Sequence, residues 1–263
     1  MSVSEPPRFL ELADRTAKPR RSGVTHVIDK GMPAAGVEAL LTSLGTMVDV
    51  WKFGFGTAYV DPTVASKIEV LRRHSVKACP GGTLLEAAWL QGRTEAFFDW
   101  AGGLGFDCVE VSRGATGLPA AVKRDLIVGA RTRGFEVFAE VGSKDSGHAA
   151  LPDEWGDEAR RDIDSGASWL VAEGRESGTA GLYDRGGAIR AELVDALETL
   201  GDEAPVIYEA PRRDQQAWLI NRLGANANLA NIAPDEVLAV EALRLGLRVD
   251  TMSKAPLIFQ RTM

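Results

Sequence analysis

VIYEAPRRDQQAWLINRLGANANLANI, residues 206–232, contains one complete unit of the pattern that decides the fold. A short apolar segment at 206–210 is followed by a polar turn, a stretch with helical periodicity at 213–223 and a second apolar segment at 226–232. Apolar runs of about 4–8 residues are typical of buried parallel strands, and two parallel strands need a crossover connection that usually contains a helix. Gly224 follows the helical stretch, where a C-terminal cap is expected. This segment therefore predicts a strand–helix–strand unit.

The same alternation runs through the whole chain without a break in composition. Eight such units favour a closed α/β fold, the (β/α)8 TIM barrel, over an open doubly wound sheet, and barrels of this class take roughly 250 residues as one domain. We expect a single domain with the barrel at about 24–245 and short N-terminal and C-terminal extensions. The expected strands are 24–29, 48–54, 76–80, 108–112, 136–142, 169–173, 206–210 and 226–232. The expected helices are about 34–44, 61–74, 84–102, 119–133, 153–166, 189–200, 213–223 and 234–245.

Composition narrows the class of protein. Hydrophobic residues make up 45% of the 263 residues and charged residues 25%, as in soluble domains that bury a large core. The net charge of −7 disfavours a nucleic-acid-binding protein, because no basic surplus is present to neutralise phosphates. No apolar run approaches the roughly 20 residues of a membrane span, and the N-terminus has no signal-peptide pattern, so we expect a cytoplasmic protein without a membrane partner. Cys79 and Cys108 lie in apolar segments without metal-ligand spacing, which predicts buried free thiols.

Charged residues and glycines gather where the predicted strands end. The active sites of (β/α)8 barrels lie at the C-terminal ends of the strands, so these residues are the candidates for function. They are Asp29-Lys30-Gly31, Lys52, Gly81-Gly82-Thr83, Glu110 to Arg113, Glu140 to Lys144, Glu173 to Gly178, Glu209 to Arg212, and Asn228 with Asn231.

The second predicted strand carries the most informative residue. Side chains two apart in a strand share a face, so Trp51, Phe53 and Phe55 should lie under the helices while Lys52 points into the barrel. An inward lysine is costly unless it meets an anion. That anion is either a carboxylate in an ionic layer that merely fills the barrel, or a ligand.

The charges at the rim indicate the class of ligand. Lysines, arginines and carboxylates occur there together, which suits a small phosphorylated carboxylic acid bound with a divalent cation; Mg²⁺ prefers such hard oxygen ligands. Glycine turns at Gly81-Gly82 and at 174–178 can offer backbone N–H groups to a phosphate. The cations are Lys30, Lys52, Lys144, Arg175 and Arg212, and the anions are Asp29, Glu110, Glu140, Glu173 and Glu209.

These strand-end segments resemble the phosphosulfolactate synthase family. The similarity extends from about Lys18 to Thr251, with EGRESG, PGGTL and EAPxxxQQ as its most specific motifs. It implies a (β/α)8 barrel that adds sulfite to phosphoenolpyruvate with Mg²⁺ and forms phosphosulfolactate, a precursor of coenzyme M. The matching segments are DKG (29–31), KFGFGT (52–57), PGGTLLE (80–86), GFDCVEVS (105–112), EVGSK (140–144), EGRESG (173–178), YEAPRRDQQ (208–216), NLANI (228–232) and LRLGLRVDT (243–251).

The resemblance and the positions together suggest roles for individual residues. We expect Lys144 to donate the proton to C2, with Lys52 as the second candidate and Lys30 as a further catalytic cation. Glu140, Glu173 and Glu110 are the expected Mg²⁺ ligands, directly or through water. The expected substrate contacts are Arg175, Ser177, Arg212, Gly81, Gly82, Ser112, Arg113 and Asn228.

One departure from the family leaves the nucleophile open. After EVS the family usually has an acidic or amide residue before glycine, whereas this chain has Arg113-Gly114. Arg113 either faces solvent or adapts the site to an anion other than sulfite. Three hypotheses follow: a synthase that uses sulfite, a related enzyme that adds another anionic nucleophile, and a non-catalytic, stress-associated homologue. We also expect a homo-oligomer, and Trp89, Phe97, Phe98 and Trp100 are candidates for either core or interface.

Overall fold

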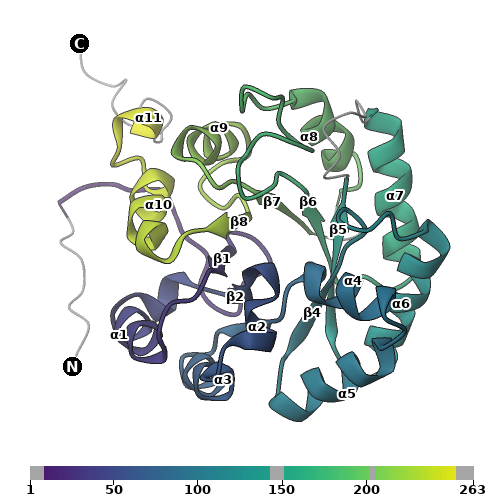
Figure 1. The fold of residues 1–263 in the computed structure, drawn as a ribbon. Coiled ribbons are helices and arrows are strands. Elements are labelled where there is room, and N and C mark those ends of the chain that lie inside the picture. The colour runs from purple at the N-terminus through teal and green to yellow at the C-terminus, as the bar shows by residue number, and fades with distance from the viewer. Residues whose placement is uncertain (1–8, 143–150, 202–204, 253–263) are drawn as a thin grey trace.

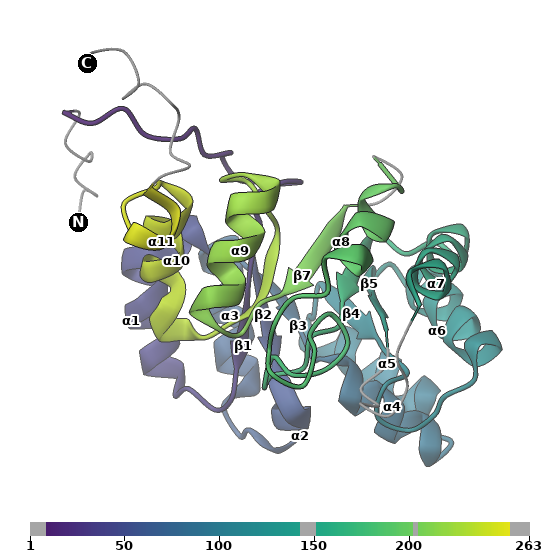
Figure 2. The same cartoon turned by 90° about the horizontal axis from the view of Figure 1, so that it is seen from above.

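The computed structural model describes residues 9–142, 151–201 and 205–252. Eight parallel strands form a nearly closed barrel, and the helices lie outside it (Figure 1). Seen from above, α1, α9 and α10 lie on one side of the strands and α6 and α7 on the other (Figure 2). The strands are β1 Thr25–Asp29, β2 Val50–Phe53, β3 Lys77–Cys79, β4 Cys108–Val111, β5 Glu136–Val141, β6 Trp169–Ala172, β7 Val206–Glu209 and β8 Leu229–Ile232.

All eight predicted strands are present, in the order β3-β2-β1-β8-β7-β6-β5-β4. The first and last strands of this order, β3 and β4, are joined by fewer backbone bonds than the other pairs. Asp107 N donates to Ala78 O at 3.2 Å, and Ala78 N donates to the Asp107 side chain at 2.9 Å. A side-chain carboxylate thus replaces part of the backbone ladder where the barrel closes.

The helices differ from the prediction at two places. The expected helix at 84–102 is two helices, because the chain turns at Gly92, whose φ is +64°. The expected helix at 61–74 begins only at Val64, and a separate short helix precedes it. The α-helices are α1 Ala34–Leu44, α2 Thr57–Val60, α3 Val64–Arg73, α4 Gly82–Leu90, α5 Thr94–Leu104, α6 Ala120–Thr132, α7 Pro152–Asp164, α8 Ala191–Glu198, α9 Arg213–Leu223, α10 Val237–Arg244 and α11 Val249–Met252; the short 3₁₀ turns are η1 Gly45–Met47, η2 Gly54–Gly56 and η3 Pro234–Glu236.

Alternation along the strands produces two hydrophobic clusters. The larger cluster lies between the sheet and the helices and includes Trp51 and Phe53, both fully buried. The smaller cluster lies inside the barrel, toward the N-terminal ends of the strands. Both cysteines belong to it as buried free thiols, as predicted. Its members are Val24, Val50, Cys79, Cys108, Phe138, Trp169, Val171, Ile207 and Ala230.

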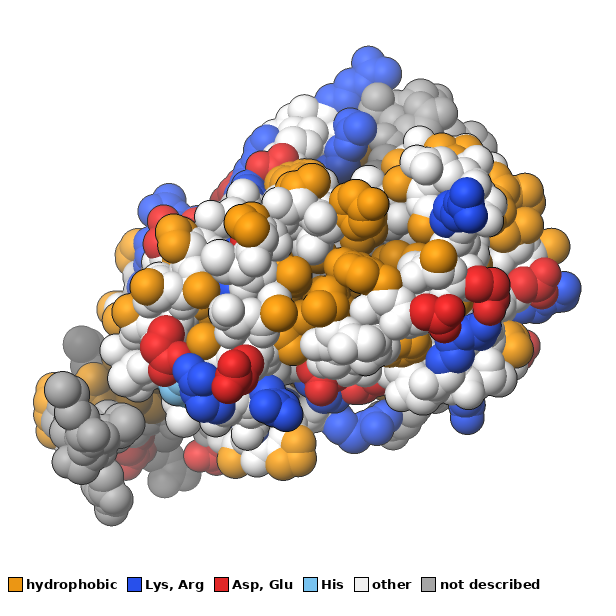
Figure 3. All heavy atoms as spheres, turned by 60° about the horizontal axis from the view of Figure 1, so that its bottom comes forward, with side chains coloured by type: hydrophobic (Ala, Val, Ile, Leu, Met, Phe, Trp, Pro, Cys, Tyr) orange, Lys and Arg blue, Asp and Glu red, His pale blue; other side chains and the backbone are white. Residues whose placement is uncertain are grey.

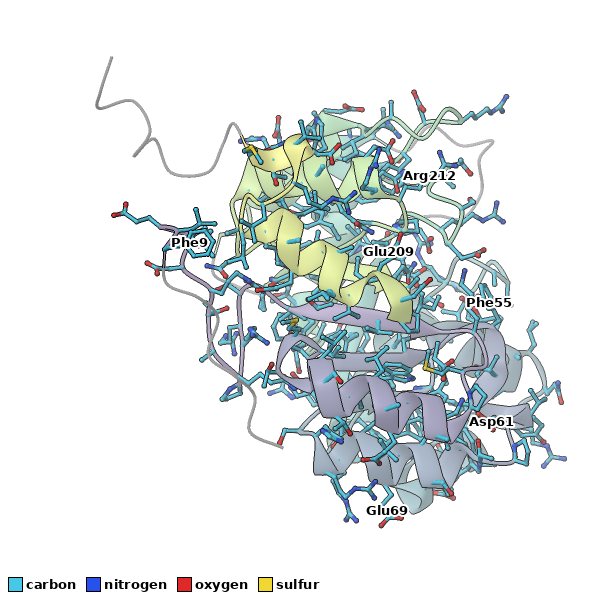
Figure 4. All side chains as sticks on the ribbon, turned by 90° about the vertical axis from the view of Figure 1, so that its left-hand side faces the viewer. Phe9, Phe55, Asp61, Glu69, Glu209 and Arg212 are labelled. Carbon is cyan, nitrogen blue, oxygen red and sulfur yellow. The ribbon has the colours of Figure 1, made fainter. Side chains whose placement is uncertain are left out.

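The prediction for Phe55 was wrong. The second strand ends at Phe53, and the chain continues as η2 with Phe55 at a φ of +55°. Strand alternation no longer applies there, so Phe55 does not join Trp51 under the helices and its side chain is 56% exposed. Figure 4 shows Phe55 and Arg212 at one end of the barrel and Phe9 at the opposite end.

The segment before β1 covers the N-terminal end of the barrel. The Lys18 ammonium donates to the carbonyl oxygens of Gly45 and Ser75, each at 2.9 Å, and Arg20 donates to Asp49 at 3.0 Å. The Lys18 side chain at this end thus donates hydrogen bonds to carbonyl oxygens at helix ends and in loops, where backbone partners are missing. A cavity lined by strand-end residues lies at the opposite, C-terminal end of the barrel. No helix among the described residues is both long and apolar enough to cross a membrane.

The aromatic residues after β3 belong mainly to the core. Phe97 and Phe98 are buried, and Trp89 and Trp100 are half-buried against the same cluster. Hydrophobic side chains also gather in a hollow of the surface toward the bottom of Figure 1 (Figure 3). A cavity between α2, α4 and α5 is lined there by Tyr59, Leu84, Ala87, Ala88, Gln91, Arg93, Ala96, Phe97 and Trp100.

Candidate functional site

Lys52 is the centre of the polar end of the barrel. Its ammonium lies 3.1 Å from Glu110 Oε2 and 3.1 Å from Glu209 Oε1, and all three side chains are buried. Burial by itself would lower the pKa of Lys52, but the neighbouring carboxylates, foremost Glu110 and Glu209, outweigh it and raise that pKa well above its usual value. Lys52 is therefore a permanent buried cation held by carboxylates.

The same two carboxylates fix the backbone of two rim loops. Glu110 Oε1 accepts from Gly82 N at 3.0 Å, and Glu209 Oε2 accepts from Gly174 N at 3.0 Å. Each carboxylate thus uses one oxygen for Lys52 and the other for a glycine turn. The predicted ionic layer exists, and it also orients both glycine-rich turns of the rim.

A cavity of about 420 Å³ lies directly above this layer. Most of the predicted strand-end residues come together in it, including Lys52, Gly81, Gly82, Glu110, Glu140, Glu173, Arg175 and Ser177. Its other lining residues are Ile28, Gly54, Phe55, Thr83, Glu176, Glu209 and Asn231.

Strained backbone conformations concentrate at this cavity. Among the described residues, four that are not glycine have a positive φ: Phe55, Ser75, Arg175 and Asn231. All of them except Ser75 line the cavity. Such conformations cost of order 1–3 kcal/mol each and cluster at active sites and ligand clamps. The strain therefore supports a functional role for the cavity that its charges alone would not establish.

The loop after β6 is held in place by α9. Arg212 Nε donates to Ser177 O at 2.8 Å, and Gln215 Nε2 donates to Gly178 O at 2.9 Å and to Gly187 O at 3.1 Å. Arg212 was predicted to contact substrate, but it does not line the cavity and instead supports the loop that carries Arg175. The EAPxxxQQ motif thus holds the EGRESG loop.

Glu140 and Glu173 are the best candidates for holding a cation. They lie at the ends of neighbouring strands, line the cavity and offer the hard oxygen donors that Mg²⁺ prefers. Across the described ranges, no group of three or more His, Cys, Asp or Glu side chains is placed to hold a metal ion. Mg²⁺ at substrate sites is commonly held by one or two carboxylates together with substrate oxygens and water. The donor set therefore fits a cation that binds with its substrate.

Two further predicted substrate contacts, Asn228 and Ser112, do not line the cavity. Asn228 precedes β8 at the N-terminal end of the barrel, where it accepts from Val24 N and donates to Val206 O, each at 3.0 Å. Ser112 donates to the buried carboxylate of Glu86 on α4. In each case the polar side chain already forms hydrogen bonds with a neighbouring group of the protein.

The predicted catalytic lysines have different positions. Lys30 is at the edge of the site, with its side chain 47% exposed, 2.5 Å from Glu176 and 6.0 Å from the ring centre of Phe55. Lys144 lies outside the described residues. Only Lys52 is placed inside the cavity by the structure.

Among the lining residues that were absent from the predicted ligand and substrate contacts, Glu209 and Asn231 carry polar side chains that are buried. Glu209 was recognisable as a strand-terminal acid like Glu110, Glu140 and Glu173, yet its pairing with Lys52 across the barrel depends on closure. Alternation could not predict that Asn231, and not Asn228, lines the cavity. The register of β8 against β1 shifts between Leu229 and Ile232, so regular alternation does not hold at Asn231.

Arg113 pairs with a helix, away from the cavity. Its Nε lies 2.7 Å from Glu158 Oε1 on α7, and it does not line the cavity. The structure therefore places Arg113 against α7 and outside the cavity lining, which weakens the argument that it selects another nucleophile.

We expect Arg113→Asp to lower stability without changing the preferred nucleophile. The new carboxylate would face Glu158, and the loss of a partly exposed pair costs about 1 kcal/mol. Denaturant unfolding and initial rates with several anionic nucleophiles would measure both effects. A changed nucleophile preference at unchanged stability would contradict this expectation.

Arg113 belongs to a buried charge cluster that supports the end of β5. The Lys123 ammonium donates to Glu158 at 2.9 Å, to Asp162 at 2.6 Å and to the carbonyl oxygen of Glu140 at 2.6 Å. Glu158 also accepts from Gly142 N at 3.3 Å. The cluster therefore fixes the backbone that directly follows the Glu140 side chain.

Asp162 gives this cluster a pH dependence. Burial is the main cause that raises the pKa of Asp162 from 3.8 to about 6, despite the nearby Lys123. Because the folded protein holds this proton more tightly than the unfolded chain, the contribution of Asp162 to stability is present below about pH 4 and is lost as the pH rises through 6. Asp162→Asn should remove that loss, roughly 1–3 kcal/mol, from the pH dependence of the free energy of unfolding. Asp164→Asn, which removes an exposed carboxylate from the same helix, is the control; an identical pH profile for both variants would refute the expectation.

The fold and the cavity together define a (β/α)8-barrel enzyme whose site lies at the C-terminal ends of the strands. Residues 13–250 match the family described as (2R)-phospho-3-sulfolactate synthase (ComA). The chain therefore belongs to the phosphosulfolactate synthase family.

Curated relatives agree over nearly the full length. A phosphosulfolactate synthase of Methanothermobacter thermautotrophicus is 40% identical over 251 residues, which are 92% of this chain and 96% of the relative. That of Methanocaldococcus jannaschii is 40% identical over 88% of this chain and 94% of its own length, and that of Bacillus subtilis is 35% identical over 92% and 97%.

Solved structures agree on the fold. A 3-hexulose-6-phosphate synthase has a TM-score of 0.55 at 17% identity, covering 84% of this chain and 98% of its own. The BexX/CysO complex of Amycolatopsis orientalis has a chain with a TM-score of 0.54 at 18% identity, covering 94% and 95%. At these identities the likeness concerns the barrel alone.

Proposed function

We propose that this enzyme is a carbon–sulfur lyase of the synthase type, which adds sulfite to C3 of phosphoenolpyruvate and forms phosphosulfolactate, with Mg²⁺ bound beside the substrate. The observation that carries the proposal is the single cavity in which the strand-end motifs shared with this family meet around Lys52. Its size and charges suit a small phosphorylated acid.

The chemistry needs a site that stabilises a developing negative charge. Sulfite forms a bond from sulfur to C3, the electron pair of the C2–C3 double bond moves toward the carboxylate, and a proton is then added to C2. Lys52 is fixed and permanently charged, so it stabilises that negative charge without reorganisation. Its raised pKa makes it a weaker acid, which favours Lys144 as the proton donor.

Recognition of the phosphate would use backbone groups. Gly81 caps the N-terminus of α4, and Gly82 and Thr83 begin its first turn; all three line the cavity, where N–H groups at the start of a helix attract anions. Arg175, in the loop after β6, also lines the cavity and supplies a guanidinium group. Mg²⁺, held by Glu140 and Glu173 with substrate oxygens, would neutralise charge on the carboxylate when bound.

Phosphorus NMR tests the proposal directly. The purified protein is incubated with phosphoenolpyruvate, sulfite and Mg²⁺, and with each component omitted in turn. A new phosphate ester that depends on all of them is the expected result. Mg²⁺-dependent binding of phosphoenolpyruvate without turnover would indicate another nucleophile, and neither binding nor turnover would favour the non-catalytic homologue.

A further inference from the structure

A second cavity lies at the N-terminal end of the barrel, opposite the cavity around Lys52. Its volume is about 360 Å³, within the range of small-molecule sites in proteins. Its lining includes the segment before β1 and the first residues of β2, β3 and β6. The two cavities share no lining residue, so the proposed reaction gives this second cavity no role.

One wall of this N-terminal cavity is apolar and flat. The rings of Phe138 and Trp169 are stacked, with their centres 5.9 Å apart and their planes 6° from parallel. Both residues line the cavity, together with Val24 and Val50. The indole N–H of Trp169 donates to Glu136, so Trp169 contributes its ring to the cavity wall. Such a wall suits the ring of a small planar ligand.

The polar part of the lining carries more positive than negative charge. Three cations line the cavity, Lys18, Arg20 and Lys77, against the single carboxylate of Asp49. Asp49 already accepts from Arg20 Nη1 at 3.0 Å and from the backbone N–H of Thr25 at 2.9 Å. The excess of cations favours an anionic group on the ligand.

Two of these cations retain hydrogen-bond donors for that anion. Among the described residues, Arg20 donates through Nε and Nη1, and its Nη2 has no acceptor. Lys77 pairs with Glu136 through one contact, and an ammonium group has three donors.

Lys18 adds a positive charge without a carboxylate bound to it. Within the described part of the chain, its ammonium donates only to the carbonyl oxygens of Gly45, His74 and Ser75. Burial lowers the pKa of Lys18 from its ordinary value. An anion in the cavity would stabilise the charged form of this side chain.

We infer that the N-terminal cavity is a second ligand site that takes a small aromatic carboxylic acid. The ring of the acid lies against Phe138 and Trp169, and its carboxylate lies beside Arg20 and Lys77. Hydrogen bonds between ionised groups are about twice as strong as those between neutral groups, so the carboxylate makes a large contribution to affinity. The inference does not depend on the proposed function.

Benzoate is the probe, and benzamide, which has nearly the same shape without the charge, is its matched control. The protein is labelled with 5-fluorotryptophan, and fluorine NMR follows its six tryptophans during each titration. The Trp169 resonance is identified by its absence from Trp169→Phe. Benzoate should shift this resonance with a dissociation constant of about 1–10 mM, as expected for a ligand of this size, and benzamide should bind about tenfold more weakly.

Two variants separate the charge at this cavity from the charge of the protein as a whole. Lys77→Met and Arg124→Met each remove a partly exposed cation, but Arg124 lies on α6 and does not line the cavity. Lys77→Met should bind benzoate about three- to fivefold more weakly and benzamide as the wild type does. Arg124→Met should bind both as the wild type does. Thermal unfolding of each variant identifies any folding defect.

Other results would overturn defined parts of the inference. If benzoate leaves the Trp169 resonance unmoved, there is no ligand site against Phe138 and Trp169. Equal affinity for benzoate and benzamide, or an unchanged benzoate affinity in Lys77→Met, would show that the cations of the lining do not select an anion. An equal loss of benzoate affinity in Arg124→Met would reduce the effect of Lys77 to the net charge of the protein.

Discussion

Lys52→Met should abolish turnover of phosphoenolpyruvate and sulfite and destabilise the fold by about 3–5 kcal/mol. The substitution keeps the length of the side chain but leaves Glu110 and Glu209 buried together without their cation. Removing one partner of a buried ion pair costs this much because an uncompensated charge remains. Denaturant unfolding and the phosphorus NMR assay would measure the two losses.

The pH dependence of the variant provides a further check. Protonation of either carboxyl would relieve the repulsion, so the stability deficit of Lys52→Met should shrink as the pH is lowered. Lys77→Met is the control, because Lys77 pairs with Glu136 at the opposite end of the barrel and its side chain is 43% exposed. That exposed pair should contribute about 1 kcal/mol or less. A Lys52→Met protein as stable as Lys77→Met would contradict the interpretation that Lys52 is a buried cation required by Glu110 and Glu209.

Gly81→Ala should cost at least about 3 kcal/mol and weaken phosphoenolpyruvate binding more than tenfold. Gly81 has φ +78° and ψ 147°, a conformation that is almost restricted to glycine. An added Cβ would lie 2.8 Å from the carbonyl oxygen of Phe53, which is backbone and cannot move aside alone. Relief of this contact would displace the Gly82 amide from Glu110 and disturb the turn that we assign to the phosphate.

Gly92→Ala separates backbone strain from the effect on the site. Gly92 also has a positive φ, +64°, but nothing lies within 4 Å of a Cβ there, and it lies in the turn between α4 and α5. It should lose only about 1 kcal/mol, with unchanged binding. Thermal unfolding and calorimetry on both variants test this, and equal effects on binding would show that Gly81 has no special role at the site.

The prediction of strands succeeded because burial on both faces leaves a clear apolar signal. The same signal placed Lys52 inside the barrel and strand-terminal glutamates on its rim. The prediction failed where the backbone departs from regular strand or helix conformation. This happens at Phe55, which follows the end of β2, and at Gly92, which divides one expected helix into two.

The sequence by itself determined the class of fold, the family and the end of the barrel at which the polar strand-end residues gather, because these depend on periodicity and on short motifs along the chain. Only the tertiary structure decided which polar side chains face the cavity. Arg113, Ser112 and Arg212 bind to Glu158, Glu86 and the Ser177 carbonyl, partners that are 26–45 residues away in the chain. The bulge of β8 turns Asn231 inward and leaves Asn228 at the far end. The direction of a polar side chain is set by whichever partner the closed barrel brings nearest, and that partner is not encoded in local spacing.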